Sequence, residues 1–121
     1  MTLRARVQEL IAYVEQGLFL EAYREFYHND VAVQENDTAP RLGLASSLEH
    51  ETCFLETVET FDKINARSFI VDGNRAAIRW NFEATLKGGR RMSRDEIAYQ
   101  EWDGEKIICE RYFFDSNPQL L

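Results

Sequence analysis

The second half of the chain decides its fold, and residues 72–115 read DGNRAAIRWNFEATLKGGRRMSRDEIAYQEWDGEKIICERYFFD. Three glycine turns divide this half of the chain: Asp72-Gly73-Asn74, Lys87-Gly88-Gly89 and Asp103-Gly104. Asx-Gly and Gly-Gly pairs reach positive φ angles at little cost, so each of these sites predicts a hairpin turn. We therefore expect four strands, at residues 64–71, 75–86, 91–102 and 105–115, joined as an antiparallel meander.

The second of these strands alternates most clearly. Its apolar face carries Ile78, Trp80, Phe82, Ala84 and Leu86, and the residues between them are mostly polar. A half-buried antiparallel sheet requires this period of two. The pattern predicts that one face of the sheet is covered.

The first half of the chain supplies the cover. Leu3, Val7, Leu10, Ile11 and Val14 lie at helical spacing, and Gly17 is a plausible end for that helix. A second short helix is predicted over 19–27 and a short strand over 30–35, followed by a loop at 36–40. The apolar residues of the predicted third helix are Leu44, Leu48, Leu55, Val58 and Phe61.

Helices followed by a meander predict an α+β fold. Strands of this length twist and coil, so we expect one domain spanning 1–121. In it, a cone-shaped curved antiparallel sheet of four to six strands wraps around three N-terminal helices. Such a cone encloses an apolar pocket.

Composition excludes several classes of function. The net charge of −7 argues against a nucleic-acid partner, which needs clustered Lys and Arg. Cys53 and Cys109 are isolated and predict buried thiols in a reducing compartment. No metal-ligand spacing or phosphate loop is present, so we expect no metal and no cofactor. No segment resembles a signal peptide or a membrane span, so the expected location is the cytoplasm.

Four stretches of the chain carry a family resemblance: Glu15-Gln-Gly17-Leu-Phe-Leu, Phe26-Tyr-His-Asn-Asp30-Val-Ala-Val, Arg41-Leu-Gly43, and Trp102-Asp-Gly-Glu-Lys-Ile107 leading to Arg111-Tyr-Phe-Phe-Asp115. Their order and spacing resemble the nuclear-transport-factor-2-like superfamily, in its SnoaL-like polyketide cyclase and ketosteroid isomerase branch. The resemblance implies a cystatin-like cone. It does not imply one reaction, because the superfamily carries many unrelated activities.

The resemblance transfers some roles residue by residue. The general base of the isomerase branch falls at Glu35, and the cyclase branch commonly ends its last strand in an acid, here Asp115. The two oxyanion donors of the isomerase fall at Leu10 and Ala98, which cannot donate. Tyr13, one helical turn after Leu10, could offer a different hydroxyl.

Strand phase adds further candidates. Glu110 is in phase with Tyr112 and Phe114, so these three side chains share one face, either towards the pocket or outside at a dimer interface. Glu35 is either a pocket base or a solvated loop acid. The expected ligand-binding residues are Tyr13, Trp80, Phe82, Ala98, Gln100, Trp102 and Phe114, for which plain core packing is the alternative. The roles of His28 and His50 stay open, although His50 could pair with Glu35 or Asp115 in proton transfer.

Two functions follow from this pattern. In one, a non-catalytic module binds a small apolar molecule in the pocket. In the other, a metal-independent acid–base enzyme of cyclase, isomerase or hydrolase type acts on a small apolar carbonyl compound, with Glu35 as base, Glu110 or Asp115 as acid or orienting group, and Tyr112 as hydroxyl donor. A pocket acid titrating above about pH 6 would favour the enzyme. A homodimer is also expected, because Phe69 and Val71 predict apolar surface on the outer face of the sheet.

Overall fold

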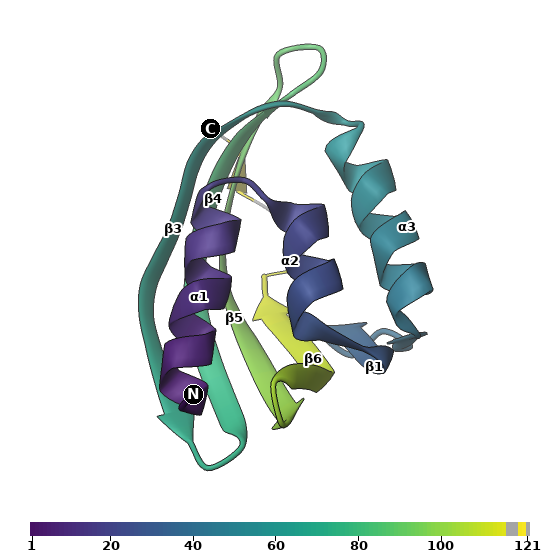
Figure 1. Ribbon diagram of the computed structural model, residues 1–121. Helices are drawn as coiled ribbons and strands as arrows, with labels where there is room; N and C mark the ends of the chain where they lie inside the picture. Colours follow the sequence, from purple (N-terminus) through teal and green to yellow (C-terminus); the bar gives the residue numbers. More distant parts are fainter. Residues whose placement is uncertain (116–118, 121) are drawn as a thin grey trace.

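The computed structural model of the protein describes residues 1–115 and 119–120, in which three helices lie against one curved sheet (Figure 1). The helices are α1 (Leu3–Glu15), α2 (Phe19–Phe26) and α3 (Leu44–Leu55). The strands are β1 (Tyr27–Glu35), β2 (Arg41–Leu42), β3 (Val58–Asp72), β4 (Arg75–Leu86), β5 (Arg91–Asp103), β6 (Lys106–Phe114) and β7 (Gln119–Leu120). The predicted cone-like α+β fold is confirmed.

The sheet has the strand order β2-β1-β6-β5-β4-β3, and β7 pairs with β5. The three hairpins from β3 to β6 form the predicted meander, and their turns hold glycines at positive φ, such as Gly73 and Gly104 at 61°. The sheet is antiparallel except where β1 lies parallel to β6. This pairing brings an early strand next to the last long strand.

The sheet curves because its longest hairpin is irregular. The β3–β4 pairing shifts register at three places, between Val58 and Thr60, Phe61 and Lys63, and Ala66 and Ser68. Each bulge increases the local twist and bends the strand that carries it. The long strands consequently bend around the helices (Figure 1).

The third helix is shorter than its apolar pattern predicted. It ends at Leu55, and Thr57 donates its backbone N–H to the carbonyl of Phe54. Val58 and Phe61 therefore belong to β3, and the expectation that they continue the helix was wrong. Spacings of three and four residues fit either a helix or a bulged strand when the run is short.

The core fills the end of the cone near the β3–β4 turn. Val7 and Phe26 from the helices pack with Ile78, Ala98 and Ile107 of the sheet, and all five are fully buried or nearly so. The inward face of β4 and β5 thus matches the predicted alternation. At the other end of the cone the same inward rows line open space.

The outer face of the sheet is apolar at different positions from those expected. Phe69 and Val71 pack against the core, so their assignment to the outer face was wrong. Ile70, on the opposite phase of β3, is 70% exposed, and Ile97, Tyr99 and Phe113 are exposed on β5 and β6. The phase of a strand shows which residues share a face, and packing decides which face is inside.

Both cysteines are more accessible than predicted. Cys53 is exposed on α3 and Cys109 is half-buried on β6, so the expectation of two buried thiols was wrong. None of the helices in residues 1–115 and 119–120 has the length and hydropathy of a membrane span.

Candidate functional site

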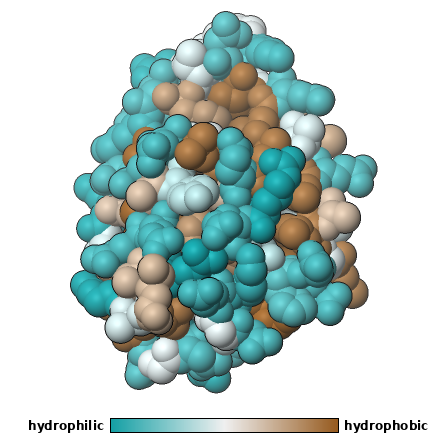
Figure 2. Space-filling view, viewed as in Figure 1, coloured by the Kyte–Doolittle hydropathy of each residue, from teal (hydrophilic) through white to brown (hydrophobic). Residues whose placement is uncertain are grey.

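A cavity of about 480 Å³ lies between the helices and the inner face of the sheet. Seen from the helix side, apolar side chains gather above α2 and along the seam between α2 and α3, with polar residues around them (Figure 2). The cavity is lined by Leu10, Val14, Phe19, Ala22, Tyr23, Tyr27, Glu35, Arg41, His50, Glu51, Cys53, Phe54, Phe61, Trp80, Phe82, Ala84, Met92, Arg94, Glu96, Gln100, Glu110 and Tyr112.

Aromatic rings form much of the apolar wall. The rings of Trp80 and Phe82 stack with centroids 5.7 Å apart, and the ring of Phe19 packs on Phe61 at 4.8 Å. Rings at this spacing give flat, stiff surfaces. The wall suits a flat apolar molecule.

Glu110 is the centre of a buried hydrogen-bond network, and its side chain is only 1% exposed. The Tyr27 hydroxyl donates to Glu110 Oε1 at 2.5 Å, and Gln100 Nε2 donates to Oε2 at 2.7 Å. Trp102 Nε1 in turn donates to Gln100 Oε1 at 3.0 Å. We call Tyr27, Gln100, Trp102 and Glu110 the inner network. Both oxygens of the Glu110 carboxyl group therefore accept a hydrogen bond.

The inner network extends to two more tyrosines. The hydroxyls of Tyr27 and Tyr112 lie 3.5 Å apart, and Tyr23 hydrogen-bonds to Tyr112. Burial raises the pKa of Tyr23, Tyr27 and Tyr112 well above the usual range, so all three stay protonated. Burial also raises the pKa of Glu110, and the hydrogen bonds from Tyr27, Tyr112 and Gln100 oppose that rise. The result is a cluster of hydroxyl donors at one side of the cavity.

Asn36 joins the end of β1 to the end of β6, next to Tyr112 in the cavity lining. Its φ of 50° ends β1, and its N–H donates to the Tyr112 carbonyl at 2.8 Å. Its Oδ1 accepts from the Phe114 N–H, and its carbonyl accepts from Arg111 Nε. Asparagine tolerates this left-handed conformation better than most residues do. The register of Glu35 with Tyr112 is fixed as a consequence.

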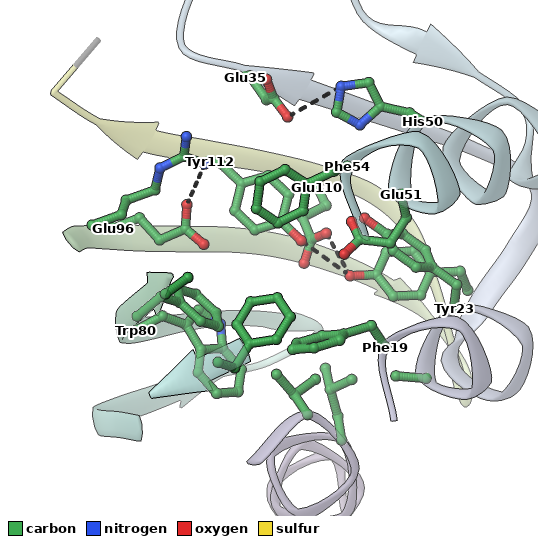
Figure 3. Close-up of a pocket in the computed structure, with 18 of the residues that line it drawn as sticks. Phe19, Tyr23, Glu35, His50, Glu51, Phe54, Trp80, Glu96, Glu110 and Tyr112 are labelled. Carbon is green, nitrogen blue, oxygen red and sulfur yellow. Dashed lines mark hydrogen bonds and ion pairs between the residues drawn. The ribbon is translucent and has the colours of Figure 1, made fainter. Parts of the chain in front are cut away.

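Two further acids face the cavity without a hydrogen bond from any described residue, and we call Glu51 and Glu96 the outer acids. Glu96 is 7% exposed, and its nearest cation is Arg94 Nη1 at 3.9 Å. Burial raises the pKa of Glu96 and of Glu51 to about 7 in each case. Glu51 extends from α3 towards Glu110 and Tyr23, whereas Glu96 lies beside Trp80 (Figure 3).

Glu35 lies at the rim between two basic side chains. Its Oε1 is 3.5 Å from Arg41 Nη1 and 4.0 Å from His50 Nε2. The second contact is drawn in Figure 3. Because its side chain is about a third exposed, Glu35 is more solvated than Glu96, which is 7% exposed. The general base that the family resemblance implied therefore lies in a wetter position than Glu96.

The residues predicted for the site divide into two groups. The structure brings Glu35, Glu110, Tyr112, Trp80, Phe82 and Gln100 together in the cavity lining. Five others lie outside the lining: Tyr13, Ala98, Trp102, Phe114 and Asp115.

Packing explains these five positions. The Tyr13 ring packs edge-on against Phe26 at 5.0 Å, and Ala98 and Trp102 are enclosed in the core. The Arg94 guanidinium covers the Phe114 ring at 4.1 Å, and Asp115 is exposed. Hydroxyls face the cavity from Tyr27 and Tyr112 instead of Tyr13.

Sequence reasoning missed Glu51 and Glu96, although a signal for each was present. Glu96 shares its strand phase with Gln100, and Glu51 follows Leu48 by three residues on α3. Arg41 and Arg94 were missed as well, because the phase of a strand does not show which rim residues bend over a cavity. Within residues 1–115 and 119–120 no cluster of His, Cys, Asp and Glu could hold a metal ion.

The comparison with protein families decides the assignment: residues 1–114 match the model of the SnoaL-like domain. The chain belongs to the SnoaL-like domain family. The match confirms the family resemblance inferred from the sequence of this SnoaL-like chain. No curated protein matches it.

Solved structures agree on the fold. A protein assigned as a SnoaL-like polyketide cyclase from Mesorhizobium loti has a TM-score of 0.81, 23% identity, and coverage of 93% of this chain and 98% of its own. A nuclear-transport-factor-2-like protein of unknown function from Burkholderia pseudomallei has a TM-score of 0.79 and 13% identity, and the match covers 93% of this chain and 89% of that protein. TerC, co-crystallised with polyporic acid, has a TM-score of 0.77, 18% identity, and coverage of 93% and 90%.

Proposed function

We propose that this chain is an acid–base enzyme that binds a small, mostly apolar carbonyl compound in the cavity. The observation that carries the proposal is Glu96, a buried carboxyl on the cavity wall that no described residue hydrogen-bonds. A general base works best when its pKa lies near the working pH, and the pKa of Glu96 is raised to about 7. The aromatic wall supplies the affinity for the apolar body of the compound.

Glu96 and Tyr112 act together in the proposed reaction. The Glu96 carboxylate removes a proton from the carbon next to the carbonyl. The Tyr112 hydroxyl turns from Glu110, which keeps Tyr27 and Gln100 as donors, and donates a hydrogen bond to the carbonyl oxygen as it gains charge. Both residues line the cavity, and they lie on the paired strands β5 and β6, where Glu96 is opposite Phe114 and Ala98 is opposite Tyr112. One small molecule can therefore contact both groups. Glu96 then returns its proton to the enolate at another carbon, which completes an isomerisation. In a ring closure the enolate carbon instead attacks a second carbonyl of the compound, and Glu96 gives its proton to the alkoxide that forms.

Glu110 has a positioning role in this proposal. Both of its oxygens already accept hydrogen bonds, so it is poorly placed to take a proton from a substrate. It orients the tyrosine hydroxyls instead. Glu35, at the more exposed rim, remains a second candidate base, and Asp115 remains a candidate only at the outer end of β6.

A non-catalytic binding module is the second candidate function. It is favoured by the absence of the isomerase donors at Leu10 and Ala98 and by the fully bonded carboxyl of Glu110. The similar TerC structure, which was co-crystallised with polyporic acid, supports small-molecule binding in either case.

Exchange of carbon-bound hydrogen separates the two functions. We would incubate the protein with 2-acetonaphthone in D₂O and follow the loss of its methyl signal by NMR, with binding followed by quenching of the tryptophan fluorescence. The enzyme accelerates this exchange over buffer. Glu96→Gln is expected to lower the acceleration by about 100-fold, because general acid–base groups contribute factors of this size.

The control variant is Glu59→Gln, which alters an exposed acid on β3 that is not part of the cavity lining. It should leave the exchange rate unchanged. Binding of the ketone without faster exchange would contradict the enzyme and support the module. An unchanged rate in Glu96→Gln would transfer the role of base to another acid, which Glu35→Gln and Glu51→Gln would test.

The homodimer expected from the sequence is also proposed, on different residues. Ile97, Tyr99 and Phe113 are exposed neighbours on β5 and β6, and Ile70 lies on the same face. Pairing of two such faces would bury them. Sedimentation analysis should give a dimer for the wild type and a monomer for Ile97→Lys, whereas a monomeric wild type would contradict the proposal.

A further inference from the structure

Two arginines in the cavity lining differ from the other well-packed arginines of the protein. Arg41 reaches the cavity from β2 and Arg94 from β5, and their side chains are only 20% and 27% exposed. The Nε atom of each is buried without a hydrogen-bond partner among the described residues. Neither guanidinium makes a hydrogen bond to any residue in the described ranges.

Arg6 and Arg111, which are also largely shielded from solvent, are hydrogen-bonded. Arg6 donates to the carbonyls of Glu25 and Glu105 and to two carboxylates. Arg111 donates from Nε to the carbonyl of Asn36 at 2.8 Å. A buried donor left unpaired costs free energy, so unmet donors on two side chains of one cavity indicate a missing acceptor.

The acids near these arginines do not supply that acceptor. Glu35 Oε1 lies 3.5 Å from Arg41 without a hydrogen bond, and Glu96 Oε2 lies 3.9 Å from Arg94. Arg41 and Arg94 nevertheless line the same cavity, together with Glu51. The two cations are therefore presented to one enclosed space.

We propose that Arg41 and Arg94 together bind a planar two-oxygen anion, a carboxylate or an ionised enol, on the ligand whose apolar body lies against the aromatic wall. The inference rests on the proposed occupation of the cavity and specifies the class of compound as an amphipathic organic acid. The flat guanidinium fork matches such an anion with two parallel hydrogen bonds. The remaining N–H groups of each arginine stay near Glu35 and Glu96.

Three probes with one aromatic body test this assignment: 2-naphthoate, 2-naphthamide and 2-naphthylmethylammonium. Their affinities are measured by titration calorimetry. We expect the wild type to bind the carboxylate about tenfold more tightly than the neutral amide, because hydrogen bonds to charged groups are worth about this much. The cationic probe should bind least tightly.

Substitution then identifies the residues. Arg41→Gln and Arg94→Gln should each lower the affinity for 2-naphthoate by about tenfold. The affinity for 2-naphthamide should stay within about twofold of the wild-type value. Retained amide binding shows that each variant still folds. Arg79→Gln is the matched control, because Arg79 pairs with Asp95 on the exposed side of the sheet.

The binding results test the anion site separately from the proposed occupation of the cavity. Equal affinity for the carboxylate and the amide would overturn the anion site and leave the cavity proposal intact. Tighter binding of the cationic probe would overturn the anion site in favour of the excess of acids in the lining. Failure of all three probes to bind would contradict both the occupied cavity and the anion site.

Discussion

The buried carboxyl group of the inner network and those of the outer acids differ in their hydrogen bonding. Glu110 is buried, and both of its oxygens accept hydrogen bonds from side chains, Tyr27 and Gln100. Glu96 is nearly as buried, yet no described residue hydrogen-bonds it. A carboxyl group whose oxygens are all occupied stabilises its surroundings, whereas one without donors is available to a ligand.

The comparison also separates stability from reactivity within one cavity. Removing the inner network should affect folding most strongly. Removing an outer acid should instead change the reaction and the pH dependence of stability, because burying a charged carboxylate without hydrogen bonds costs the folded state free energy. The four predictions that follow test this division, from the largest expected effect to the smallest.

Glu110→Ala is expected to have the largest effect. It leaves the buried donors of Tyr27 and Gln100 without an acceptor, and we expect a loss of about 4 kcal/mol in the free energy of unfolding. Urea denaturation measures this loss. Glu59→Ala, on the exposed face of β3, is the control. A loss no greater than that of the control would remove the structural role of the inner network.

The pH dependence of stability tests the outer acids. The pKa of Glu96 is about 7 in the folded chain and near 4.5 when unfolded, so the folded state holds more protons between these values. Stability should therefore fall as the pH rises from about 4.5 to 7, by about 3 kcal/mol for this group.

Glu96→Gln should remove the contribution of this carboxyl to the fall of unfolding free energy with pH. The variant should therefore be more stable than the wild type at about pH 8. Urea denaturation at about pH 5 and pH 8 gives both values. Glu59→Gln should keep the wild-type slope. An undiminished slope in Glu96→Gln would mean that this carboxyl is solvated, contrary to its burial.

The tyrosines divide the inner network further. Tyr27→Phe removes the donor at 2.5 Å from Glu110 and should cost about 2 kcal/mol of unfolding free energy. Tyr112→Phe removes a hydroxyl that lies 3.5 Å from the Tyr27 hydroxyl, and it should cost less, because Glu110 keeps Tyr27 and Gln100 as donors. In the exchange assay the order should reverse, since Tyr112 is the proposed donor to the substrate. Equal effects in both assays would show that the two hydroxyls are interchangeable.

Arg79→Gln should have the smallest effect. Arg79 forms two hydrogen bonds with Asp95, the shorter at 2.8 Å, but both side chains are about half exposed. Exposed ion pairs contribute little because water screens them. The midpoint of urea denaturation should match the wild type within error. A clear loss would show that hydrogen bonding, rather than burial, governs the contribution of charged groups in this protein.

Much of the fold follows from local sequence rules. The turns at Gly73, Gly88 and Gly104 and the alternation through Trp80 define the meander, because turn chemistry and strand phase act over a few residues. The same phase indicated that Gln100 shares a face with Ala98. Local rules failed at Val58 and Phe61, where a bulged strand imitates helical spacing.

The sequence by itself determined which residues share a face, including Glu110 with Tyr112 and Glu96 with Gln100. Only the tertiary structure decided which faces point inward and which acids receive donors. Glu51, Glu96 and Glu110 come from α3, β5 and β6, and their separation depends on the curvature of the whole sheet. Hydrogen bonding and desolvation depend on distances of a few ångströms between segments remote in sequence, and no local pattern encodes those distances.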